Sequence, residues 1–100
     1  MRFEWDEKKL EENFSKHGLD FADAWKVFNH TRLTKFDDRE DYGEDRWVSI
    51  GLLDTRIVVV VFTDREDENG EVIRIISLRK ARNHERTEYE QTIQNRLGAR

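Results

Sequence analysis

Basic side chains gather around one apolar segment in the last quarter of this chain. Arg74, Arg79, Lys80 and Arg82 flank or interrupt the apolar residues of segment 74–82. Residues 1–73 hold 11 Lys and Arg against 19 Asp and Glu, a net charge of −8, whereas residues 74–100 hold 7 against 3, a net charge of +4. Because salt screens charge over roughly 8 Å at physiological ionic strength, a concentrated basic strip can bind phosphate even on an acidic chain. The segment therefore indicates a site for an anionic ligand.

Arginine is the side chain best suited to hold a phosphate, because its planar fork donates two parallel hydrogen bonds and stays charged at any relevant pH. Arg65 and Arg79 lie near the ends of two strand-like runs that are expected to pair around the turn at Asn69 and Gly70. We therefore predict that the two guanidinium groups converge on one phosphate. The alternative is that they form ordinary ion pairs with the acidic hairpin, which contribute little to stability.

The amino-acid composition limits which other kinds of functional site are possible. The 100 residues are 36% hydrophobic and contain no proline and no cysteine, which fits a single domain over residues 1–100 without a disulfide, a thiolate nucleophile or a cysteine zinc site. The three histidines, His17, His30 and His84, show no metal-ligand spacing, so no metal or cofactor is expected. The longest apolar run, residues 57–62, is too short to cross a bilayer, and we expect a soluble, cytoplasmic protein that does not bind membranes.

Two helices are expected near the N-terminus. Asp6 is placed to cap a helix over residues 6–17, and Gly18 follows as a stop signal. A second, short helix begins near Asp20 and Asp23, because acidic residues favour a helix start. The residues expected to face inward at helical spacing are Leu10, Phe14 and His17 in the first helix, and Phe21, Trp25 and Phe28 in the second.

After Thr31 the pattern predicts an antiparallel sheet of three to four strands and then a C-terminal helix. Strand-like runs cover residues 32–36, 46–53, 56–63 and 72–79. The run 57–62 has no alternation and should be buried on both faces in the centre of the sheet. From Asn83 onward, Tyr89, Ile93 and Leu97 repeat every four residues. The fold class is therefore α+β.

Several short blocks, in this order and spacing, resemble the BrnT family, the toxins of bacterial type II toxin–antitoxin systems. The resemblance covers nearly the whole chain. Its blocks are Phe3, Glu4, Trp5, Asp6 and Glu7; Asn13 with Lys16, His17 and Gly18; Phe21 with Ala24, Val27 and Phe28; Gly43 and Glu44 with Arg46; Ile50 and Gly51; Thr63 with Arg65; Arg74, Ile75, Ile76 and Ser77 with Arg79, Lys80 and Ala81; and Glu85 and Arg86 with Tyr89.

The resemblance implies a RelE-like fold and a ribonuclease that cleaves RNA without a metal. It also implies an antitoxin partner, a BrnA-like protein with a ribbon-helix-helix domain, in a heterotetramer of two toxins and two antitoxins. Operator DNA would then be bound only through the antitoxin, and growth arrest would follow from RNA cleavage.

Such a reaction needs groups that accept and donate protons. His17 is the natural candidate because histidine titrates near neutrality, although a histidine on an apolar face is more often a core or cap residue. Glu85 is a candidate base that can equally serve only to pair with Arg82 or Tyr89 in a structural network. We therefore assign catalysis to His17, Arg65, Arg79 and Glu85.

RNA contacts are assigned to Lys16, Lys80, Arg82 and Tyr89. Tyr89 can stack on a base, but it also begins the apolar stripe of the last helix, so packing is an alternative role. Two rival functions stay open: a non-catalytic toxin that serves as an antitoxin-binding and co-repressor module, and an RNA-binding protein that does not cleave.

Overall fold

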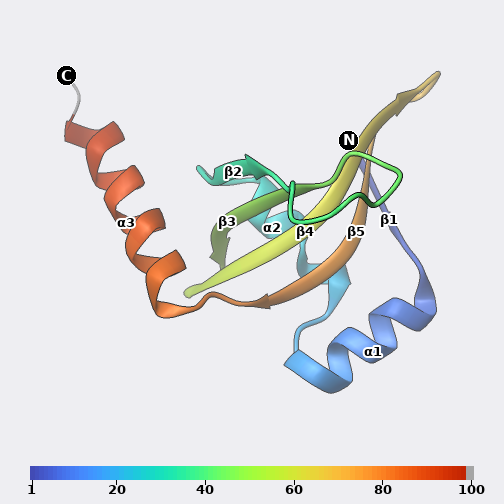
Figure 1. The fold of residues 1–100 in the computed structure, drawn as a ribbon, viewed down its shortest axis with the longest axis horizontal. Coiled ribbons are helices and arrows are strands. Elements are labelled where there is room, and N and C mark those ends of the chain that lie inside the picture. Colours follow the sequence, from blue (N-terminus) through green and yellow to red (C-terminus); the bar gives the residue numbers. More distant parts are fainter. Residues whose placement is uncertain (99–100) are drawn as a thin grey trace.

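A computed structural model describes residues 1–98 as one mixed sheet with helices on both faces (Figure 1). The sheet has five strands in the order β1-β5-β4-β3-β2. The strands are β1 (Arg2–Trp5), β2 (Leu33–Phe36), β3 (Trp47–Leu53), β4 (Arg56–Asp67) and β5 (Gly70–Lys80). The helical segments are α1 (Glu7–His17), the 3-10 turn η1 (Phe21–Asp23), α2 (Trp25–Phe28) and α3 (Asn83–Gly98).

The predicted antiparallel meander is present as β2 to β5, and the α+β class is confirmed. The predicted purely antiparallel sheet of three to four strands is wrong, because β1 adds a fifth strand parallel to β5, with Phe3 opposite Ile73. Its four residues alternate polar and aromatic side chains, and Phe3 and Trp5 pack on the core. Such an alternation over four residues is a short strand signal, which the prediction did not use. The mixed sheet does not establish the narrower RelE-like description.

The apolar run of β4 lies in the centre of the sheet, as predicted, and separates two apolar clusters. Val58, Val60 and Phe62 contribute to the larger cluster, under η1 and α2, on what we call the α2 face. Val59 belongs to the smaller cluster on the opposite α3 face, with Ile50, Ala81 and Tyr89. Only the start of the predicted α3 stripe is buried, since Leu97 is 64% exposed.

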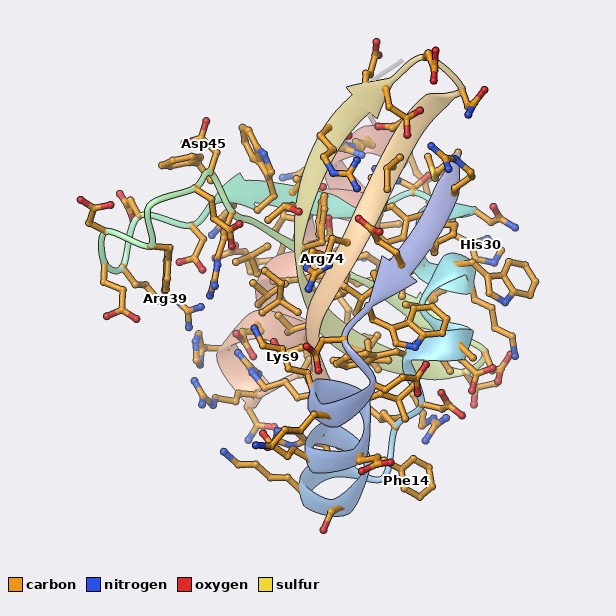
Figure 2. All side chains as sticks on the ribbon, turned by 90° about the vertical axis from the view of Figure 1, so that its right-hand side faces the viewer. Lys9, Phe14, His30, Arg39, Asp45 and Arg74 are labelled. Atoms are coloured by element: carbon orange, nitrogen blue, oxygen red, sulfur yellow. The ribbon has the colours of Figure 1, made fainter. Side chains whose placement is uncertain are left out.

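Helix α1 has the predicted ends but not the predicted inner face. The Asp6 side chain accepts hydrogen bonds from the first turn, and Gly18 ends the helix with a φ of 68°. Phe14, however, is 53% exposed and points into solvent in Figure 2, and His17 is also exposed. The buried residue of the helix is Asn13. The inward stripe of the short α2 is also wrong at Trp25, which is 45% exposed.

Asn13 is buried because its side-chain amide takes the place of a neighbouring strand. Beyond Ile75, β5 no longer pairs with β1. There the Asn13 Nδ2 donates to the Leu78 carbonyl at 2.8 Å, and the Leu78 N–H donates to the Asn13 Oδ1 at 3.1 Å. Nδ2 also donates to the Leu19 carbonyl at 3.3 Å, which ties the chain after α1 to the same point. Helix α1 is thus fastened to the free edge of β5.

A β-bulge changes the direction of side chains along β5. Val61 pairs with Ser77 but Phe62 pairs with Ile75, so Ile76 is the extra residue. Before the bulge, Ile75 faces the α2 side; after it, Leu78 does. Strict alternation would place residue 79 on the same face as Ile75, whereas the bulge directs Ser77 and Arg79 to the α3 face. Bulges commonly redirect side chains next to functional sites.

Replacing Asn13 by alanine should destabilise the fold, because the buried N–H and carbonyl of Leu78 would both lose their partner. We expect a loss of about 2–4 kcal/mol in the free energy of unfolding, measured by urea denaturation, since each unsatisfied buried group costs roughly 1–3 kcal/mol. The exposed neighbour Glu11 is the matched control, and Glu11→Ala should stay within about 0.5 kcal/mol of the wild type. Equal losses in the two variants would show that the amide does not hold α1.

Candidate phosphate-binding site

A polar groove crosses the α3 face where β5 runs into α3. Its floor is the apolar surface of Val48, Ile50, Val59 and Val61, and its volume is about 310 Å³. Pockets that hold small ligands begin at roughly 300 Å³, so the groove suits one nucleotide-sized group. Its polar lining from β5 and α3 consists of Ser77, Arg79, Arg82, His84, Glu85 and Glu88.

A second hollow, of about 280 Å³, lies between α1 and the free edge of β5. The helix side is lined by Lys9, Glu12, Asn13, Lys16 and His17, and the strand side by Ile76 and Ser77. Ser77 therefore borders both hollows. The two hollows meet at the strand edge that Asn13 fixes, so residues from the first and last parts of the chain face one area of surface.

Arg79 is held rigidly at the centre of this area. Its Nη1 donates to the Glu85 Oε1 and its Nη2 to the Glu85 Oε2, both at 2.8 Å, and Nη1 also donates to the Lys80 carbonyl at 3.2 Å. The side chains of Arg79 and Glu85 are 20% and 14% exposed. Such a bidentate pair restricts the guanidinium to one orientation. The arginine is thus positioned before any ligand arrives.

Glu85 is poorly suited to act as the general base. Its hydrogen bonds with Arg79, and then with the Arg82 backbone N–H, lower its pKa to about 2 although burial opposes this. A carboxylate with so low a pKa accepts a proton weakly near neutral pH. The bond from the Arg82 N–H, at 2.8 Å, also closes the start of α3 in the manner of a capping box. The geometry favours the structural alternative, with Arg79 as the partner instead of the Arg82 side chain or Tyr89.

His17 is well suited to accept a proton. Partial burial lowers its pKa below the usual 6.5, and the charges of Lys16 and then Arg79 lower it further. The imidazole is therefore largely neutral at pH 7. Ser77 lines both the hollow that contains His17 and the groove that contains Arg79, and so connects the two side chains. The exposed position excludes the alternative of a core histidine.

The predicted convergence of Arg65 and Arg79 is wrong. Arg65 pairs with Val72 near the hairpin tip, whereas Arg79 pairs with Val59, six residues back along β4. At about 3.3 Å per residue, the two backbones are roughly 20 Å apart. Arg65 instead forms an ion pair with Glu4 of β1 at 2.5 Å. The catalytic assignment of Arg65 has no geometric support from the groove, and a role in catalysis for this residue stays a prediction without a structural basis.

The four predicted RNA contacts are dispersed around the site. Lys16 lines the hollow beside His17, and the exposed Arg82 lines the groove. Lys80 is exposed but follows Arg79 in the strand, so its side chain leaves on the α2 face. Tyr89 is only 6% exposed and its hydroxyl donates to the Thr31 carbonyl at 3.2 Å, which favours packing over base stacking.

Sequence reasoning gave no role to His84, which the structure places in the groove with Ser77 and Arg79. The available signal was its position between Arg82 and Glu85 in the first turn of the last helix. Because Glu85 binds Arg79, residues of that turn lie beside the arginine. Predicting the position of His84 requires knowledge of the Arg79–Glu85 ion pair, and the spacing of charged residues in the sequence does not predict that pair.

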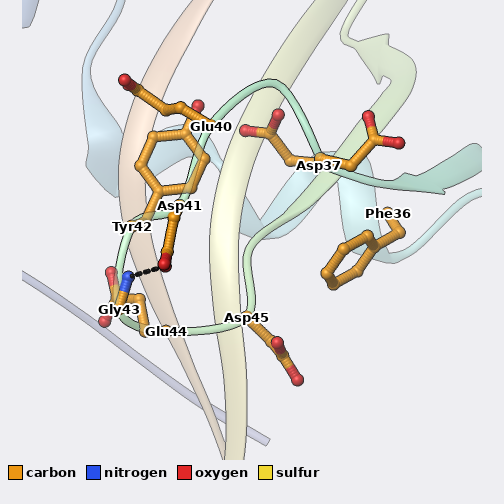
Figure 3. A pocket seen from close by; sticks show the side chains of 9 residues that line it. Phe36, Asp37, Glu40, Asp41, Tyr42, Gly43, Glu44 and Asp45 are labelled. Carbon is orange, nitrogen blue, oxygen red and sulfur yellow. Dashed lines mark hydrogen bonds between the residues drawn. The ribbon is translucent and has the colours of Figure 1, made fainter.

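A larger hollow lies elsewhere, inside the acidic loop between β2 and β3 (Figure 3). Its volume is about 660 Å³, and carboxylates dominate its lining; they belong to Asp37, Asp38, Glu40, Asp41, Glu44 and Asp45. The loop is stabilised internally: Asp41 Oδ1 accepts from the Gly43 N–H at 2.9 Å. Within residues 1–98, no group of three or more His, Cys, Asp or Glu side chains is arranged to hold a metal ion. The negative lining disfavours a phosphate-bearing ligand.

Fold and site together define a small α+β protein with a polar groove around a preorganised arginine, in which four basic and four acidic side chains line the walls. The model of one protein family, described as the ribonuclease toxin BrnT of type II toxin–antitoxin systems, matches residues 5–85. The chain belongs to this family. A type II toxin has a protein antitoxin as its partner, and the family is one of ribonucleases. No curated protein matches the chain. In the part of the chain that the structure describes, no helix is long and apolar enough to span a membrane.

The ion pair of Arg79 and Glu85 should make stability depend on pH in acid. The lowered pKa of Glu85 means that its contribution is fully present above its ordinary pKa of 4.5 and is lost as the pH falls toward about 2. Glu85→Gln should therefore lower the free energy of unfolding by about 2 kcal/mol at pH 7, since a hydrogen bond to a charged group contributes roughly 1.5–3 kcal/mol.

The difference in the free energy of unfolding between Glu85→Gln and the wild type, measured in urea melts, should become smaller as the pH falls from 5 to 2. Glu90→Gln, at an exposed position of the same helix, is the control and should show little pH-dependent difference. A gap of constant size from pH 7 to pH 2 would contradict the proposed stabilising ion pair.

Proposed function

We propose that this chain is the RNA-cleaving toxin of a type II toxin–antitoxin pair, a metal-independent endoribonuclease in which Arg79 binds the scissile phosphate. The supporting observation is the orientation of Arg79. Its hydrogen bonds within residues 1–98 are donated by Nη1 and Nη2 to the Glu85 carboxylate and by Nη1 to the Lys80 carbonyl. The Nε–H and the second Nη2 hydrogen share the other edge, and two parallel donors of this kind match a phosphate.

The reaction is a transesterification. The 2′-oxygen attacks the adjacent phosphorus, the bond to the 5′-oxygen breaks, and a 2′,3′-cyclic phosphate and a 5′-hydroxyl result. His17, largely neutral at pH 7, takes the 2′-OH proton, and Arg79 stabilises the charge that develops on the phosphoryl oxygens. Lys16 and Arg82, on either side of Ser77, bind neighbouring phosphates by charge.

The partner of this toxin would be a BrnA-like antitoxin with a ribbon-helix-helix domain, in a heterotetramer of two toxins and two antitoxins. The antitoxin supplies the operator-DNA contacts, and the toxin acts in the cytoplasm, where its RNA substrate is. Support for a protein partner is family membership. A partner that covers the groove would neutralise the toxin by excluding RNA from Arg79.

Arg79→Gln should abolish most RNA cleavage, because the uncharged amide cannot replace a fixed cation at the phosphate. We expect a loss of about 100- to 1,000-fold in kcat for a labelled single-stranded RNA in EDTA without ribosomes. Arg56→Gln, at the exposed first residue of β4, is the matched control and should cleave like the wild type. Circular dichroism and a urea melt establish that each variant is folded.

The same assay separates the rival functions. Unchanged cleavage by folded Arg79→Gln would refute the site, and strong loss in Arg65→Gln would restore the role first assigned to Arg65. Intact RNA with the wild type, both free and on ribosomes, together with tight antitoxin binding would favour the non-catalytic co-repressor module. RNA that is retained but never cut would favour a binding protein.

A further inference from the structure

We propose that His84 is the general acid of the cleavage reaction and forms, with His17, a pair of histidines on opposite sides of Arg79. This inference rests on the proposed ribonuclease function. It assigns the proton donor that the reaction still lacks, because the departing 5′-oxygen needs a proton and Glu85 cannot supply one near neutral pH.

The position of His84 follows from the Arg79–Glu85 ion pair. His84 precedes Glu85 in the first turn of α3, and the Glu85 carboxylate binds both Arg79 and the Arg82 backbone. The turn that carries His84 is thereby joined to the arginine. His84 is exposed and lines the same groove as Ser77 and Arg79, so its imidazole is accessible from the side where a phosphate would bind.

His17 approaches the same place from the other side. His17 lines the hollow along the free edge of β5, and Ser77 lines both this hollow and the groove. Ser77 and Arg79 of β5 thus lie between α1, which carries His17, and α3, which carries His84. Displacement at phosphorus requires the entering and departing oxygens to lie roughly in line, on opposite sides of the phosphoryl group. Two proton-transfer groups from opposite sides of one arginine meet this requirement.

Protons balance in this scheme. Neutral His17 accepts the proton of the 2′-OH as the bond from the 2′-oxygen to phosphorus forms. Protonated His84 donates a proton to the 5′-oxygen as its bond to phosphorus breaks, which leaves His17 charged and His84 neutral. Exchange of protons with water restores both states after the products leave.

The test uses two substrates, of which only one has a leaving group that needs a proton from a general acid. The first is a dinucleotide whose leaving group is a 5′-hydroxyl; the second is uridine 3′-(p-nitrophenyl phosphate), whose phenolate leaves without protonation. His84→Gln should lose about 100-fold or more in kcat on the dinucleotide, as expected for a lost general acid, but only a few-fold on the nitrophenyl ester. His17→Gln should lose about 100-fold on both, because each substrate needs a base for its 2′-OH.

His30→Gln is the matched control, since His30 lies after α2 on the side of the sheet opposite the acidic loop that carries Arg39 (Figure 2). It should cleave both substrates like the wild type. Equal losses of folded His84→Gln on the two substrates, or no loss on either, would overturn the role of His84 while wild-type cleavage upholds the proposed function. A wild type that cleaves neither of these substrates, nor RNA on ribosomes, would overturn both proposals.

Discussion

The site depends on the side-chain amide of Asn13. β1 pairs with β5 only as far as Ile75, and beyond that point a strand edge would be left open. The amide supplies one donor and one acceptor to Leu78, as a neighbouring strand would, and it is buried. This contact fixes the end of α1, with Lys16 and His17, beside the bulged part of β5. A hydrophobic residue at position 13 could bury itself there, but it would leave the Leu78 backbone unsatisfied.

Two devices then present Arg79 to a ligand. The bulge at Ile76 directs its side chain onto the α3 face, and Glu85 takes one edge of the guanidinium fork and leaves the other free. An arginine fixed in this way loses little conformational freedom when a phosphate binds, which is the advantage of a preorganised site. The partner carboxylate reduces the net charge of the pair, so under the proposed function long-range attraction of RNA would fall to other cations such as Lys16 and Arg82.

The sequence predicted those parts of the fold that have strong local signals. The buried run in β4 and the caps of α1 lie where their residue types placed them. The hairpin turn lies one residue earlier than predicted, at Glu68 and Asn69, since Gly70 already pairs with Asp67. The inner face of α1 was missed because its buried residue is polar and is stabilised by a strand distant in sequence. The convergence of Arg65 and Arg79 was an avoidable error. Arg65 lies four residues before Asn69, whereas Arg79 lies nine residues after Gly70, and a tight hairpin pairs only residues at equal distances from its turn. The bulge and the ion pair of Glu85 involve tertiary contacts that no local pattern encodes.

The contact between Asn13 and Leu78 joins residues 65 positions apart. During synthesis, α1 leaves the ribosome long before the strand edge that receives it. Until β5 has been made, His17 has no Arg79 beside it and the groove has no wall. A nascent chain that stops before β5 therefore carries α1 and strands β2 to β4 without the assembled site. Such a connection between distant segments also slows folding, because the loop between them must close before the contact can form. A cell that makes this protein thus has an interval in which an antitoxin already present can meet the chain before its site is complete.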